Sequence, residues 1–180
     1  MGIYLNPENV DFQEVLNSKI YVDKSELIQY TNSVLRTTQK YICVSRPRRF
    51  GKSMAANMLT AYYSRGCNSR GLFQGLKIAT HPDFEKHLNQ YNVIHLNMRD
   101  YLTESENMKQ LIQFVEDDLL DELQQEFSDL RMPRRKTLVK VLEQAFAQYK
   151  IPFVFIIDEW DCIFRVHKSD AASQKDYLDF

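Results

Sequence analysis

Hydrophobic positions along the chain follow helix-type spacing in some segments and form short unbroken runs in others. Steps of three and four residues predict a helix that starts near Asp23, another over 52–64, a long one after Thr103 and one after Pro133. Thr103 and Glu106 have the form of a capping box for the long helix. The helices are therefore expected to be amphipathic and to cover a core.

Three short apolar runs have the character of buried strands. They cover residues 41–45, 92–98 and 153–157. Because helices separate these strands, we predict an α/β fold with a parallel sheet flanked by helices in three layers, and a site at the carboxyl edge of the strands. The length suits one domain over residues 1–180, with a helical lead-in over 1–40.

Gly51, Lys52 and Ser53 stand where the first predicted strand gives way to a helix. A phosphate-binding P-loop needs exposed backbone N–H groups at a helix N-terminus, a lysine for the β- and γ-phosphates, and a hydroxyl for Mg²⁺. These three residues supply all of them. Arg46 replaces the usual first glycine of the motif, and Pro47 stiffens the start of the loop.

The arginines of this loop offer a second way to hold phosphate, because guanidinium groups bind phosphate oxygens bidentately. We therefore expect ATP to contact a continuous stretch that consists of Arg48, Arg49, Phe50, Gly51, Lys52, Ser53 and Met54. The alternative interpretation is a common turn tripeptide beside solvated arginines. The structural context of the motif has to decide between the two.

An acidic pair follows the last predicted strand. Asp158 and Glu159 come directly after the apolar run 153–157, which has the form of a Walker B element. The first acid can hold Mg²⁺ together with Ser53, and the second can activate the attacking water as a general base. A core strand that ends in a charged turn is the alternative. The two motifs in this order are much less common than either alone, which favours a nucleotide site.

Four segments resemble a known family, the prokaryotic AAA-ATPase-like proteins. They are Y-V-D-K-S-E-L at 21–27, S-R-P-R-R-F-G-K-S at 45–53, L-F-Q-G-L-K-I at 72–78 and I-I-D-E-W-D at 156–161. The resemblance implies a P-loop ATPase module whose usual loop lacks the first glycine. In longer proteins of this family, a nuclease-like domain of the PD-(D/E)XK type often follows the module, and the biological role is poorly defined.

The resemblance also implies more strands than the three predicted here. A strand with a polar sensor residue normally lies between the P-loop strand and the Walker B strand and follows both in sequence. After Phe164 the chain is polar and more helix-like. We therefore expect an ATPase module that is incomplete at its C-terminus, without sensor, arginine finger or lid. A strand-wide gap would then have to be filled by another copy or by a rearranged sheet.

Composition narrows the range of partners. With 23 basic and 24 acidic side chains the net charge is −1, so no global field draws the protein to nucleic acid or to membranes. No apolar run approaches 18 residues, and we expect a cytoplasmic protein. The cysteines are scattered without a C-x-x-C pair, which indicates free thiols, with Cys43 a small core residue of its strand.

Several functions stay open at this stage. The first is ATP hydrolysis with Lys52 and Glu159 as catalytic residues and with Mg²⁺ held by Ser53 and Asp158. The second is a nucleotide-responsive module that binds ATP without turnover and controls an attached effector. Nucleic-acid binding by the loop arginines and the basic cluster 131–136 is a third, and requires both clusters on one face. A small-molecule kinase is a weaker fourth, and an oligomer is also open.

Overall fold

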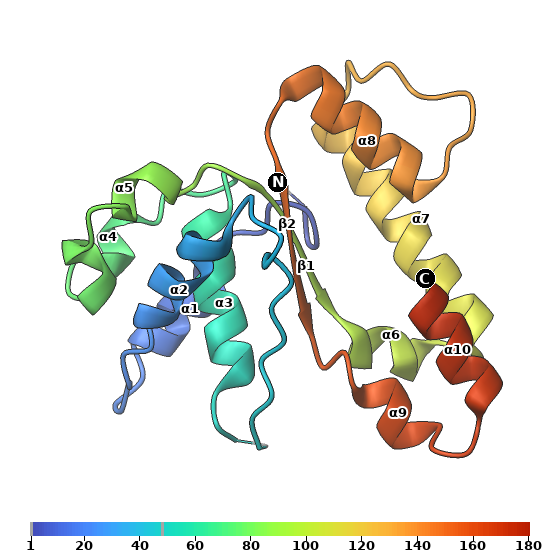
Figure 1. Cartoon of the computed structure of the whole chain (residues 1–180), viewed down its shortest axis with the longest axis horizontal. Coiled ribbons are helices and arrows are strands. Elements are labelled where there is room, and N and C mark those ends of the chain that lie inside the picture. Colours follow the sequence, from blue (N-terminus) through green and yellow to red (C-terminus); the bar gives the residue numbers. More distant parts are fainter. Residues whose placement is uncertain (1, 48) are drawn as a thin grey trace.

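The computed structural model describes residues 2–47 and 49–180. Within them, β1 (Asn92–Asn97) and β2 (Phe153–Asp158) form a parallel two-stranded sheet. The register pairs Asn92 with Phe153 and continues to Asn97 with Asp158, so the two strands end side by side. Figure 1 shows this small sheet at the centre, with helices on either side. The chain therefore has a mixed α/β fold with a parallel sheet flanked by helices.

The described helices largely follow the predicted spacing. In chain order they are α1 (Val10–Leu16), α2 (Glu26–Val34), α3 (Lys52–Tyr63), α4 (Arg70–Phe73), the 3-10 helix η1 (Lys77–Thr80), α5 (Phe84–His87), α6 (Met98–Glu104), α7 (Met108–Glu126), α8 (Leu138–Tyr149), α9 (Cys162–Val166) and α10 (Ala171–Asp179). The helix over 52–64 and the helix after Pro133 are thereby confirmed. None of the helices in the described part of the chain is long and apolar enough to cross a membrane.

The sheet separates two hydrophobic cores, because successive side chains of a strand point to opposite faces. Val93 of β1 and the partly buried Val154 and Ile156 of β2 pack with the core built by α1 to α5. Ile94 and Phe153 pack with the second core, which α6 to α9 contribute. The helix that follows the candidate phosphate loop, α3, lies in the first core and packs against β2.

Buried hydrogen bonds fix α2 against α3, the two helices on either side of the candidate loop. Asn32 donates to the Tyr62 hydroxyl (3.0 Å) and accepts from the Tyr63 hydroxyl (2.7 Å), whose oxygen lies 2.6 Å from the Thr31 hydroxyl. Burial raises the pKa of Tyr62 to about 12, so its hydroxyl stays neutral. Buried polar networks of this kind are rigid when every member is satisfied. These bonds therefore fix α2 against the C-terminal end of α3.

The N-terminal segment covers the outer edge of β1. Asn6 N–H donates to Val93 O (2.7 Å), its side chain accepts from Val93 N–H (2.8 Å), and His95 N–H donates to Tyr4 O (2.9 Å). The carboxylate of Glu122 on α7 accepts from Leu5 N–H at 2.6 Å. Glu122 is therefore a structural anchor for this edge segment. The lead-in over 1–40 includes this edge segment in addition to its helices.

The predicted first strand, 41–45, is not formed. Residues 41–47 are irregular, Tyr41 is 85% exposed, and Cys43 is exposed and not a core residue. A strand is stabilised by a neighbour on its hydrogen-bonding edge, and no strand of the described residues pairs with this segment. The β-type sequence is therefore present without the partner that would make it a strand.

The sheet has no third strand among the described residues, so one edge of β2 is unpaired. Asn92 N–H donates to Pro152 O (3.0 Å), so alternate residues from Pro152 onward turn their backbone groups toward β1. The backbone groups of Phe155 and Ile157 then face the opposite edge, where the described residues supply no partner. Their side chains are 50% and 46% exposed. The third strand that the sequence predicted for this sheet is thus absent from the described part of the chain.

The start of the long helix also differs from the prediction. Asn107 caps α7 by accepting from Gln110 N–H (3.0 Å), while Thr103 lies inside α6 and donates to Arg99 O (2.9 Å). Asn is at least as good an N-cap as Thr, because its side-chain oxygen reaches the same N–H groups. The capping box at Thr103 and Glu106 was therefore wrong, and the helix begins one turn later.

Candidate functional site

The N-terminus of α3 has the backbone form of an anion site. Gly51 adopts a left-handed conformation (φ 72°), which glycine reaches without steric cost, and its carbonyl accepts from Ala55 N–H (3.1 Å). No side chain of the described residues caps this helix, and the N–H groups of Lys52, Ser53 and Met54 have no acceptor among them. The partial positive charge of a helix N-terminus therefore faces solvent, where it attracts phosphate.

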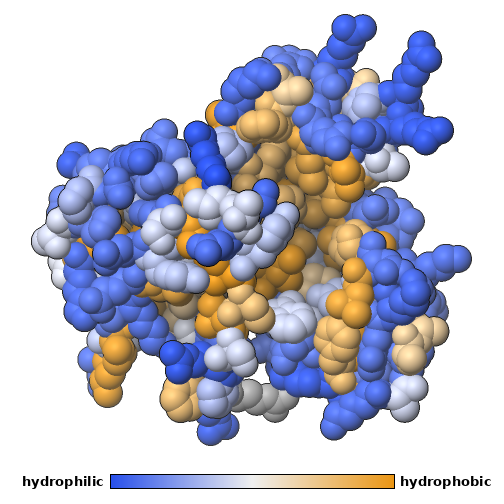
Figure 2. Space-filling view, in the orientation of Figure 1, coloured by the Kyte–Doolittle hydropathy of each residue, from blue (hydrophilic) through white to orange (hydrophobic). Residues whose placement is uncertain are grey.

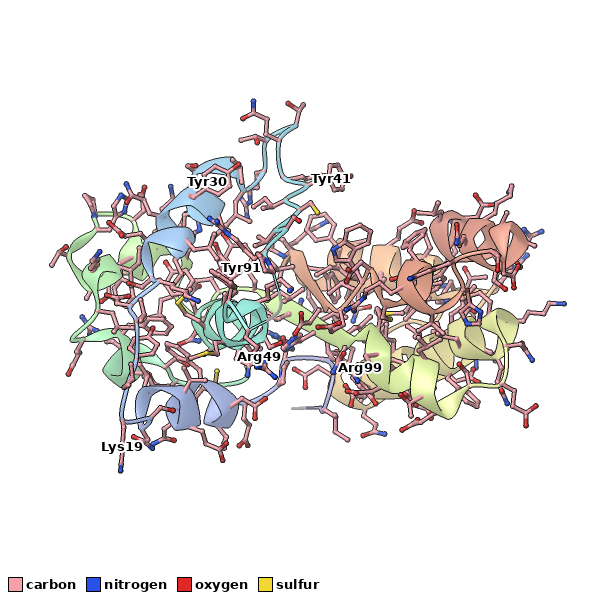
Figure 3. The ribbon with its side chains drawn as sticks, turned by 90° about the horizontal axis from the view of Figure 1, so that it is seen from below. Lys19, Tyr30, Tyr41, Arg49, Tyr91 and Arg99 are labelled. Carbon is pink, nitrogen blue, oxygen red and sulfur yellow. The ribbon has the colours of Figure 1, made fainter. Side chains whose placement is uncertain are left out.

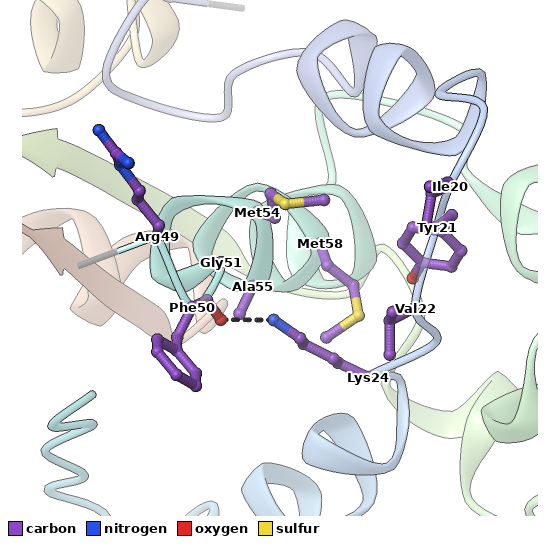
Figure 4. Close-up of a pocket in the computed structure, with 10 residues that line it drawn as sticks. All are labelled: Ile20, Tyr21, Val22, Lys24, Arg49, Phe50, Gly51, Met54, Ala55 and Met58. Atoms are coloured by element: carbon purple, nitrogen blue, oxygen red, sulfur yellow. Dashed lines mark hydrogen bonds between the residues drawn. The ribbon is translucent and has the colours of Figure 1, made fainter. Parts of the chain in front are cut away.

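Side-chain cations gather around this loop. Lys52 Nζ donates to Arg46 O (2.9 Å), so its ammonium is folded back onto the loop. The backbone of Arg49 also adopts a left-handed conformation (φ 68°). Lys24, which precedes α2, reaches across and donates from Nζ to Phe50 O at 2.6 Å (Figure 4). The predicted contact residue Arg48 lies outside the described residues.

Lys24 is the site residue that reasoning from the sequence missed. Its neighbour Asp23 accepts from Ser25 N–H (2.8 Å) and from Lys77 N–H (2.9 Å), which ties the segment to η1. Burial would raise the pKa of Asp23, but the donors from Lys77 and Ser25 outweigh it and lower that pKa below its usual value. The only available signal was the position of Lys24 within the Y-V-D-K-S-E-L segment, which carried the resemblance but had no assigned chemistry.

The acidic pair at the end of β2 is held by its surroundings. The Asp158 carboxylate accepts a hydrogen bond from Glu159 N–H (2.9 Å). The backbone of Glu159 adopts a left-handed conformation (φ 52°). The carboxylate of Glu159 forms an ion pair with Arg165 of α9, whose guanidinium also lies 3.4 Å from Asp161. Glu159, the predicted general base, is therefore already engaged by a cation.

A histidine of β1 links the sheet to the loop helix α3. Burial lowers the pKa of His95 although the charge of Asp158 opposes that shift, so the ring is neutral at pH 7. Its Nδ1 lies 3.1 Å from the Thr60 hydroxyl on α3. Asn97, the register partner of Asp158, ends β1 and caps α6 by accepting from Arg99 N–H (3.2 Å). The strand ends are thus polar and ordered.

The two predicted halves of the site lie at the same end of the molecule. Figure 1 shows the N-terminal end of α3 and the carboxyl ends of β1 and β2 all at the lower end of the view. A cavity of about 330 Å³ adjoins Gly51 but is lined from the side of residues 20–24. Asp158 and Glu159 are not among its lining residues. The structure therefore brings the halves to one end without forming one cavity around both.

The metal prediction rests on few protein ligands. Among the residues that the structure describes, no group of three or more His, Cys, Asp or Glu side chains could hold a metal ion. Mg²⁺ in nucleotide sites is usually bound by one or two protein oxygens together with phosphates and water. A hydroxyl from Ser53 and a carboxylate from Asp158 have the right chemistry for that shared type of site.

These features are those of an ATPase-like nucleotide-binding module of the α/β class. The comparison with known families agrees, because residues 10–180 match the family model described as predicted AAA-ATPase. The chain belongs to this family. Searches of curated proteins and of solved structures found no match to the chain.

Proposed function

We propose that the chain binds ATP with Mg²⁺ at the N-terminus of α3. One observation carries the proposal: an uncapped helix N-terminus with the sequence Gly-Lys-Ser points to the same end of the molecule as Asp158. Negative charge is favoured at that position by the helix dipole and by the adjacent Lys52 and Arg49. The family match over most of the chain supports the same conclusion.

The residues have separate roles in this proposal. Lys52 exchanges its contact with Arg46 O for the β- and γ-phosphates, while Arg48 and Arg49 hold outer phosphate oxygens. Phe50 and Met54 border the loop, where they contact the nucleotide. Ser53 and Asp158 would hold the Mg²⁺, which supplies charge neutralisation on the phosphates.

Hydrolysis requires a further change at Glu159. The carboxylate of Glu159 is paired with Arg165, so it is not free to orient a water molecule. In the proposed ATPase, Arg165 releases Glu159 before that side chain orients the attacking water. Binding and turnover are therefore separable in this protein.

A second candidate function follows from the same ion pair. If Arg165 stays on Glu159, the chain is a nucleotide-responsive module that binds ATP without turnover and acts on an attached effector. A nuclease-like domain is the effector that we propose from the family resemblance. The unpaired edge of β2 beside the irregular segment 41–47 is where the further strand of a P-loop NTPase-type, three-layer sheet would lie.

Nucleic-acid binding by combined basic clusters is less favoured. Figure 1 places the segment between α7 and α8, which carries the cluster 131–136, at the top of the view and the candidate loop at the bottom. One continuous basic face would need both clusters side by side. We therefore do not include nucleic acid in the proposal.

Isothermal titration tests the proposal directly. The parental chain should bind Mg·ATP, and Lys52→Ala should weaken binding at least tenfold, because it removes the cation assigned to the β- and γ-phosphates. Lys150→Ala is a matched control, since this lysine lies after α8, away from the loop. Equal affinity of the parental chain and Lys52→Ala would reject the site. Phosphate release in a parallel assay separates the ATPase from the binding module.

A further inference from the structure

A cavity lies beside the candidate phosphate site and shares Gly51 with it. It has a volume of about 330 Å³, and its walls come from residues 20–24 and from one face of α3. On α3 that face consists of Gly51, Met54, Ala55 and Met58, which follow the three- and four-residue spacing of one helix side. Figure 4 shows these residues opposite Ile20, Tyr21 and Val22.

The two ends of this cavity differ in chemistry. At the loop end lie the ammonium of Lys24, bonded to Phe50 O at 2.6 Å, and Arg49. At the other end Met54, Met58 and the segment 20–22 present mostly sulfur, aliphatic carbon and the ring of Tyr21, whose hydroxyl is buried. A ligand that fills the cavity must therefore be anionic at one end and apolar and compact at the other.

Apolar side chains around the cavity remain uncovered. Ile20 is 83% exposed, and Val22 and Phe50 are also largely exposed, although they border a cavity and not an isolated surface position. Grouped exposed apolar side chains of this kind mark ligand or partner sites. A cavity of a few hundred Å³ with apolar walls and a few polar groups is typical of a small-molecule site.

The dimensions match the nucleoside part of a nucleotide. Gly51 and Met58 are seven residues apart on α3, and a rise of 1.5 Å per residue places them about 10 Å apart along the helix. Phosphates at Gly51 would therefore leave the ribose beside Met54 and the base near Met58. Methionine suits a flat ring, because its flexible and polarizable side chain makes favourable contacts with aromatic faces.

We propose that this cavity, which we call the 20–24/α3 cavity, is the nucleoside subsite of the protein, with the base between Val22 and the methionines of α3. The inference rests on the proposed nucleotide-binding function and extends it to a part of the chain with no assigned chemistry. Lys24 is a positioning residue in this account, because it holds the loop carbonyl of Phe50 at the junction between the phosphate end and the nucleoside end.

The test compares ATP with inorganic tripolyphosphate, which has the phosphates but no nucleoside. Isothermal titration of the full chain with Mg²⁺ should give an affinity for ATP at least tenfold above that for tripolyphosphate. Val22→Asn makes the apolar wall polar, and Ala55→Leu fills the cavity from α3. Both variants are uncharged, so each should lower ATP affinity about tenfold and leave tripolyphosphate affinity unchanged.

The controls keep the inference separate from the proposed function. Val139→Asn changes a valine of almost the same exposure, 62% against 64% for Val22, on the remote helix α8, and should alter neither affinity. Because Val22 is exposed, its variant can be read even if Ala55→Leu fails to fold. Equal affinity of the parental chain for both ligands, or equal losses for both in Val22→Asn, would overturn the nucleoside subsite. Binding of neither ligand by the parental chain would instead reject the proposed function.

Discussion

Release of Glu159 from Arg165 offers a quantitative test of whether this ion pair limits ATP turnover without affecting ATP binding. The variant Arg165→Gln removes the guanidinium that pairs with Glu159 and keeps a polar, uncharged side chain. The two side chains are only partly exposed, 33% for Arg165 and 21% for Glu159, so the pair is neither fully screened nor fully desolvated. The substitution should therefore change the chemistry of Glu159 measurably.

The magnitude follows from the strength of such pairs. A hydrogen bond to a charged group contributes about 1.5–3 kcal/mol, and partial exposure places this pair near the lower limit. About 1.4 kcal/mol corresponds to a tenfold change in the population of free Glu159. If Glu159 activates water, Arg165→Gln should raise the ATP turnover rate about tenfold at saturating Mg·ATP, while the affinity for Mg·ATP stays the same.

Phosphate release at saturating ATP is the assay, with Arg70→Gln as the control. Arg70 forms an exposed ion pair with Glu85 on α4 and α5, so its loss should leave turnover unchanged. Combining Arg165→Gln with Glu159→Gln should abolish the gain. A lower turnover rate in Arg165→Gln would refute the reasoning, because it would show that Arg165 itself assists the reaction. Binding without phosphate release in every variant would favour the binding module.

Three further predictions concern the loop and its support. Lys24→Met should weaken Mg·ATP binding several-fold in a titration, because it frees Phe50 O, whereas Lys109→Met on the exposed side of α7 should not. Gly51→Ala should lower the free energy of unfolding, measured in urea, by about 1–2 kcal/mol, because alanine is strained in the left-handed backbone conformation of Gly51. Gly71→Ala is the control and should not lower it, because a Cβ added at Gly71 meets no atom within 4 Å. The folded pKa of Asp23 lies below its unfolded value near 4, so the Asp23 carboxylate stabilises the fold above about pH 4 and that contribution is lost as the pH falls further. In urea unfolding at pH 7, Asp23→Asn should therefore have a lower free energy of unfolding than the parental chain, and the difference should shrink toward pH 3. A difference in unfolding free energy that does not change with pH would contradict this.

Local patterns predicted much of the secondary structure. The helix spacing after Gly51 and the apolar run before Asp158 are confirmed as α3 and β2, because each segment carries its own periodicity or β-branched composition. The parallel pairing of β1 with β2 also followed from helices that separate the strands. The helix and strand assignments depend on residues that are close together in the sequence.

Features that depend on distant partners were not predictable in the same way. The segment 41–45 has strand-type composition, but a strand needs a neighbour that the described chain does not supply. Lys24 reaches Phe50 O only because Asp23 and Ser25 are bonded to η1, more than fifty residues away. Likewise, the ion pair between Glu159 and Arg165 depends on the turn into α9, which acidic spacing alone does not reveal.

The central claim is that one nucleotide touches both the N-terminus of α3 and the end of β2. Amide NMR spectra of the chain with a non-hydrolysable ATP analogue test it directly when Mg²⁺ is replaced by paramagnetic Mn²⁺. The account predicts strong broadening of the signals of Lys52 and Ser53 and, in the same titration, of Asp158 and Glu159. Broadening near the loop alone, with the signals of Asp158 and Glu159 unchanged, would contradict the account.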